Sequence, residues 1–180
     1  MKKILGIIMT LTLCVFVSGC KSDEADKAYA VTVNGVNIVV GETKMEALKD
    51  SEYLREVNFD QMLQKNSYYQ GIAMYTQDRE YIGSIEVLSE NEASLKDAII
   101  ASISVKTEDL SKVDITFEGV QLKDITLDKA KELMPGADGD EESVFDPGSG
   151  DYYTSLGFDE NTLTRFETKR NYDVDYSKGK

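Results

Sequence analysis

Hydrophobic and polar residues alternate along most of the chain beyond residue 30, and this alternation predicts short β-strands. Residues 30–40 contain two such segments, one on each side of Asn34-Gly35. An Asn-Gly pair between apolar segments is typical of a two-residue hairpin turn, because both turn residues must adopt a positive φ. We therefore predict a β-hairpin centred on Asn34 and Gly35.

A second hairpin is predicted from residues 68–75 and 81–88, with a polar tip near Asp78. In residues 99–105 every odd position is apolar and most even positions are polar, which favours a further strand. The alternative is a helix, because residues 95–103 also fit a helical pattern.

Two short helices are predicted from signals at their first residues. Thr43 and Glu46 match a capping box, in which each side chain bonds the other residue's backbone N–H. A second helix is expected to begin at Thr126 and to stop at Pro135-Gly136. The residues expected to face the core from these two helices are Met45, Leu48, Leu127, Ala130, Leu133 and Met134.

The pattern of the first hairpin returns 84 positions later, where residues 115–122 repeat the apolar phase of residues 31–38. The same order of features follows: a helix start, a tyrosine pair at residues 152–153, and a hairpin with its tip at residues 159–161. Self-similarity over a long period indicates a duplicated unit. The alternative is that strand alternation followed by a helix cap looks similar in unrelated segments.

The first twenty residues follow a different pattern. After Lys2 and Lys3, the mainly apolar run of residues 4–17 is too short for a membrane-spanning helix, which needs about 20 residues, but it suits a signal-peptide core. The following Val17-Ser18-Gly19-Cys20 resembles the lipobox of bacterial lipoproteins. The resemblance implies cleavage before Cys20, lipidation of the Cys20 sulfur, and attachment to the extracytoplasmic face of the cell membrane. The alternative is an ordinary secreted protein with a cysteine at this position by accident.

These patterns together predict an α+β fold: two tandem hairpin–short helix–hairpin units with an antiparallel sheet and helices on one face. The expected organisation is a signal peptide at 1–19, a lipidated tether at 20–30, a first unit at 31–105, a second unit at 106–172 and a polar tail at 173–180. The arrangement loosely resembles the β-lactamase-inhibitor-like and outer-membrane-assembly lipoprotein modules. In such families a strand pair after a short helix binds partner proteins.

Composition excludes several kinds of chemistry. The chain has no histidine, and its second cysteine, Cys14, lies in the expected signal peptide, so Ser-His-Asp and Cys-His catalysis and zinc sites of imidazole or thiolate are excluded. Without the signal peptide the chain carries 18 basic and 33 acidic residues, a net charge of −15. Such a charge repels nucleic-acid phosphates. We expect no nucleic-acid partner, no cofactor and no catalytic residues.

We therefore expect a non-enzymatic, lipid-anchored binding or scaffolding module of the bacterial cell envelope, with an envelope protein or a wall polymer as partner. The candidate binding residues are Tyr68, Tyr69, Tyr152 and Tyr153, since tyrosine offers a broad contact area at low entropic cost. The alternative for these tyrosines is ordinary core packing.

Two further alternatives depend on acidic residues. A surface enzyme acting on glycans would need two carboxylates in one cleft, about 5 to 10 Å apart. The acidic loop at residues 138–142, with Asp146 nearby, offers oxygen ligands of the kind that calcium prefers, but it departs from the EF-hand spacing. We favour a solvated loop, and we expect no metal site.

Overall fold

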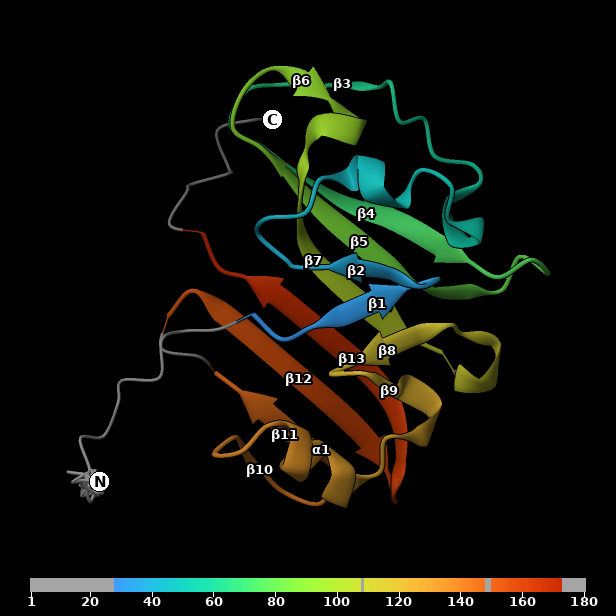
Figure 1. The fold of residues 1–180 in the computed structure, drawn as a ribbon, viewed down its shortest axis with the longest axis vertical. Helices are drawn as coiled ribbons and strands as arrows, with labels where there is room; N and C mark the ends of the chain where they lie inside the picture. Colours follow the sequence, from blue (N-terminus) through green and yellow to red (C-terminus); the bar gives the residue numbers. More distant parts are fainter. Residues whose placement is uncertain (1–27, 108, 148–149, 173–180) are drawn as a thin grey trace, which may run out of the picture.

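The computed structural model describes residues 28–107, 109–147 and 150–172, shown in Figure 1. The strands in these residues are β1 (Val31–Val33), β2 (Val36–Ile38), β3 (Met62–Leu63), β4 (Ser67–Tyr75), β5 (Tyr81–Ser89), β6 (Ala93–Ser94), β7 (Ile99–Lys106), β8 (Ile115–Phe117), β9 (Val120–Gln121), β10 (Asp138–Gly139), β11 (Ser143–Asp146), β12 (Tyr152–Asp159) and β13 (Thr162–Arg170). The helices are η1 (Met45–Leu48), η2 (Glu52–Leu54), η3 (Leu95–Asp97), η4 (Leu110–Lys112), η5 (Leu122–Asp124) and α1 (Leu127–Leu133).

The fold is mainly β, so the predicted α+β class with helices on one face of a sheet is wrong. Within the described residues the helical segments are five 3₁₀ turns and one α-helix, α1, of seven residues. Segments this short cannot form a helical layer over a sheet. The main packing partner of the large sheet is instead a second, smaller sheet (Figure 1).

The first predicted helix shows why the expectation failed. Thr43 does not cap it: the Thr43 hydroxyl accepts a hydrogen bond from the backbone N–H of Val39 at 2.9 Å. The segment closes as the single 3₁₀ turn η1, whose period of three residues places Met45 and Leu48 on the same buried side. The predicted burial of these two side chains is therefore confirmed, although the α-helix is not.

The second predicted helix is confirmed as α1. The Thr126 hydroxyl accepts a hydrogen bond from the backbone N–H of Lys129 at 3.2 Å, as an N-cap does. Ala130 and Met134 are buried, and the helix ends before Pro135.

Two antiparallel sheets form the body. The small sheet has the strand order β2-β1-β8-β9, and the large sheet has the order β10-β11-β12-β13-β7-β5-β4. Figure 1 shows the small sheet lying across one face of the large one. Phe117 of β8 and Phe166 of β13 are fully buried between them, with ring centroids 5.3 Å apart. Strands from both predicted units enter both sheets, so one core serves the whole described body.

The predicted Asn-Gly hairpin is confirmed. Asn34 and Gly35 have φ values of 49° and 75°, and they join β1 to β2 with Val33 opposite Val36. The turn between β8 and β9 has the same backbone form, with φ values of 48° at Glu118 and 77° at Gly119. The hairpin β4–β5, the hairpin β12–β13 and the strand β7 are confirmed as well.

The two small hairpins lie side by side through β1 and β8. Thr32 lies opposite Thr116, 84 positions later, and their hydroxyl oxygens are 2.7 Å apart. On either side of this pair, Val31 lies opposite Phe117 and Val33 lies opposite Ile115, so the two three-residue strands are paired along their full length. The small sheet therefore has a local two-fold relation about the Thr32–Thr116 pair.

The hydroxyl pair can be tested by a double-mutant cycle. Thr32→Val or Thr116→Val alone leaves a partly buried hydroxyl without this partner, and we expect each to lower the free energy of unfolding by about 1 kcal/mol. The double variant should lose clearly less free energy of unfolding than the sum of the two single losses, because neither hydroxyl is then left without its partner. Urea denaturation gives the free energy of unfolding of the wild type and the three variants. Strictly additive losses would contradict the pairing of the two hydroxyls.

Candidate functional site

The predicted lipidation residue, Cys20, lies outside the residues that the structure describes. Of the helices in the described ranges, none combines the length and the apolar character that crossing a membrane requires.

The structure divides the four candidate tyrosines between the two faces of the large sheet. Tyr69 lies opposite Val87 on the face that carries the core, and Tyr152 packs against that core. Tyr68 and Tyr153 lie on the other face, because neighbouring residues of a strand point to opposite sides. The four residues therefore do not form one platform.

Tyr68 and Tyr153 mark the ends of a polar row across that other face. The Tyr68 hydroxyl donates a hydrogen bond to the Glu86 carboxylate. Glu86, Ser102, Lys169 and Tyr153 then follow one another on β5, β7, β13 and β12. The Lys169 ammonium lies 4.7 Å from the centre of the Tyr153 ring. Both tyrosines are thus engaged by charged neighbours on this face.

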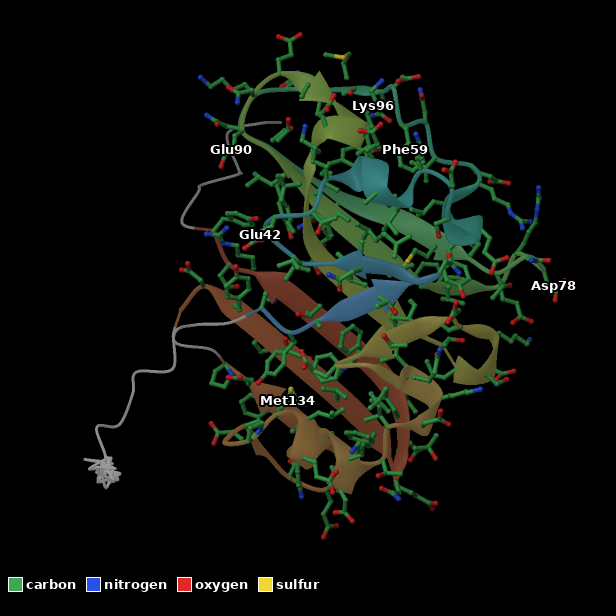
Figure 2. The ribbon with its side chains drawn as sticks, viewed as in Figure 1. Glu42, Phe59, Asp78, Glu90, Lys96 and Met134 are labelled. Carbon is green, nitrogen blue, oxygen red and sulfur yellow. The ribbon has the colours of Figure 1, made fainter. Side chains whose placement is uncertain are left out.

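A concave feature of the described residues adjoins β4, which ends the large sheet. A groove of about 760 Å³ runs between the segment of residues 52–61 and the β4–β5 hairpin. Tyr69, Ile72 and Tyr75 line its β4 side, and the buried ring of Tyr53 lies at its η2 side. Figure 2 shows Phe59 on the flanking segment and Asp78 at the far tip of the hairpin.

Tyr53 is held firmly beneath the groove. Its hydroxyl accepts a hydrogen bond of 2.6 Å from the backbone N–H of Asp114. Burial raises the pKa of the Tyr53 hydroxyl, so this residue stays neutral across the physiological range. Tyr53 therefore gives the groove a fixed aromatic wall rather than a reactive group.

Polar contacts cross one end of the groove. The Gln77 side-chain amide donates to the Glu52 carboxylate at 2.6 Å, and the Arg79 guanidinium pairs with Glu56 at 3.1 Å. The Arg79–Glu56 pair is highly exposed, with side-chain exposures of 84% and 75%, so it contributes little to stability. A ligand can therefore displace this contact at small cost.

Glu52 and Glu56 also bear on the glycan-hydrolysis alternative, since both line this groove. Glu52 accepts from Gln77 and lies 3.8 Å from the Arg55 guanidinium, and Glu56 pairs with Arg79. Both carboxylates are thus engaged by cationic or amide neighbours at the end of the groove.

The acidic loop is organised by its own hydrogen bonds. One oxygen of the Asp140 carboxylate accepts from the backbone N–H groups of Glu142 and Ser143, each at 2.9 Å, and from the Ser143 hydroxyl. Asp146 accepts a hydrogen bond from Tyr29 at 2.6 Å. The part of the chain that the structure describes contains no group of three or more acidic side chains placed to hold a metal ion.

The loop predicts a pH effect at Asp140. Hydrogen bonds from the Glu142 and Ser143 backbone hold the pKa of Asp140 below its ordinary value of 3.8. The folded pKa lies below the unfolded one, so the turn's stabilisation is complete above about pH 4 and is lost as the pH falls through the folded pKa. An NMR titration of the carboxyl carbon measures this. A midpoint at or above the ordinary value would contradict the turn geometry.

Sequence reasoning missed the groove. Residues 51–67 show no clean hydrophobic period, so nothing indicated that this segment forms a wall facing Tyr69 and Tyr75. One signal for the other wall was available: residues 67–75 form a nine-residue strand that contains three tyrosines and no charged residue. No protein-family model, no curated protein and no solved structure matches this chain.

Proposed function

We propose that this chain is a lipid-anchored, non-enzymatic binding module on the extracytoplasmic face of a bacterial cell membrane, and that the groove along β4 is its docking site. The anchor is supported by the lipobox-like Val17-Ser18-Gly19-Cys20. A diacylglycerol group carries two acyl chains, and two chains hold a protein at a bilayer far more durably than one.

One observation carries the docking site. In the described residues, the exposed large hydrophobic side chains all fall between residues 62 and 81: Met62, Tyr69, Tyr75 and Tyr81. Exposed apolar surface gathered in one region, with polar residues around it, is typical of an interaction site. Two of these four side chains, Tyr69 and Tyr75, line the groove and lie on the edge strand β4.

The anchor is tested by Cys20→Ser, with Cys14→Ser as a matched control inside the expected signal peptide. Cells are fed an alkyne analogue of palmitate, and membrane fractions are separated from soluble ones. We expect C20S to lose the label and C14S to keep both label and membrane location. A labelled C20S protein would overturn the anchor.

The docking site is tested by placing a photo-crosslinking amino acid at Tyr69, in the groove, or at Tyr153, on the opposite sheet face. The proposal predicts light-dependent adducts with an envelope component in intact cells from position 69 only. Equal adducts from both positions, or none from position 69, would contradict the docking site.

A further inference from the structure

β4 carries neither the charged residues nor the proline that protect many natural edge strands. Edge strands are normally short, charged, proline-containing, bulged or covered, because an open edge pairs readily with another chain. β4 spans Ser67–Tyr75 without a charged residue or a proline, and among the described strands it pairs with β5 alone. Its pairing with β5 shifts register twice, between Tyr69 and Ile72 and between Met74 and Tyr75.

The opposite edge of the same sheet is protected. β10 has only the two residues Asp138–Gly139 and continues into Asp140, Glu141 and Glu142. A further strand gains few backbone hydrogen bonds there and meets a block of negative charge. The two edges of one sheet are thus built differently, and β4 is the edge open to extension.

The groove gives an added strand room for its side chains. Tyr69 and Ile72 face the groove from β4, and Val57 and Leu95 line it from the flanking segments. When a peptide extends a sheet, backbone hydrogen bonds supply affinity, and pockets for alternate side chains supply specificity. β4 and its groove offer both elements together.

Charge around the groove selects the kind of peptide. The charged residues that line the groove balance one another, two acidic (Glu52, Glu56) and two basic (Arg55, Arg79), whereas the wider segment of residues 42–80 carries eight acidic and five basic side chains. The chain as a whole is strongly acidic, with a net charge of −13. A basic segment is attracted to such a surface, whereas a second copy of this chain is repelled.

We propose that β4 binds an extended, basic polypeptide segment by adding it as a further antiparallel or parallel strand, with alternate side chains entering the groove. This inference rests on the proposed binding function and names the class of its partner. The Arg79–Glu56 contact at the end of the groove opens to admit the segment.

The test uses the full lipidated chain in a zwitterionic detergent and a capped nine-residue peptide that alternates lysine with threonine or valine. A second peptide has the same sequence with every second backbone nitrogen methylated, which keeps its charge and removes hydrogen-bond donors. Calorimetry should show binding of the first peptide and a loss of at least about tenfold for the second, since several edge hydrogen bonds disappear.

Two tyrosine variants locate the binding. Tyr69→Lys places a cation in the groove and should lower the affinity for the first peptide at least about tenfold, as loss of a central aromatic contact does. Tyr153→Lys is the matched control, because Tyr153 lies on β12 on the opposite face of the sheet and lines no part of the groove; the affinity of this variant for the first peptide should stay within about twofold.

Three results would overturn the inference: equal affinity for the methylated peptide, binding of an N-acetylglucosamine oligomer but of neither peptide, or a concentration-dependent dimer that Y69K abolishes. The first indicates charge attraction alone, the second a glycan site and the third self-association. If the peptides fail while position 69 still crosslinks in cells, this inference fails and the proposed function stands.

Discussion

Gly83→Ala is expected to lower the free energy of unfolding by about 3 kcal/mol or more, because the added methyl group meets backbone on the neighbouring strand. A Cβ at Gly83 would overlap the carbonyl oxygen of Ser104 and lie 2.9 Å from the Cα of Val105. Neither atom can rotate away, as a side chain could. Gly83 also has a φ of 152°, which residues with side chains rarely adopt.

Gly71→Ala is the matched control for this prediction. Gly71 also has a positive φ, 77°, but a Cβ there would have no neighbour within 4 Å. The Gly71→Ala variant should therefore lose only the stability that backbone strain costs, about 1–2 kcal/mol. Thermal or urea unfolding compares the two, and equal losses would show that β5 and β7 do not approach as closely as described.

Phe166→Ala is expected to cost about 3–5 kcal/mol, a large part of the 5–15 kcal/mol that typically holds a domain folded. The Phe166 ring is fully buried and contacts Phe117 at 5.3 Å between centroids. Its removal leaves a cavity where the small sheet meets the large one. Denaturant unfolding at several temperatures measures the loss.

Phe145→Ala separates this effect from the general loss of an aromatic ring. Phe145 lies on β11 opposite Ser155, on the face away from the core, and is only partly buried. Its loss should cost no more than about 1.5 kcal/mol, since less apolar area is removed from contact. A Phe145 variant as unstable as the Phe166 variant would contradict the placement of the core.

The features predicted correctly from the sequence are those that depend on interactions within a few neighbouring residues. Asn34-Gly35 is recognisable because few residue pairs accept two positive φ values, and Thr126 is recognisable because its side chain satisfies an N–H of its own helix. Strand alternation also places Tyr68 and Tyr69 on opposite faces once their strand is known.

The features that were missed depend on contacts between distant residues. β7 lies between β5 and β13, and β1 pairs with β8, but alternation within each strand does not specify its neighbours. The position of β4 at the edge of the sheet therefore could not be predicted. The helix expected after Thr43 failed for a different, local reason: the Thr43 hydroxyl accepts a hydrogen bond from the backbone N–H of Val39 instead of capping the following turn.

Backbone hydrogen exchange is the most direct test of strand addition at β4 in the full chain. On addition of the basic nine-residue peptide, amides within Ser67–Tyr75 should become protected, while those of β10 and β11 should keep their exchange rates. Unchanged exchange along β4 under conditions where the peptide is bound, or protection confined to another part of the sheet, would contradict the account.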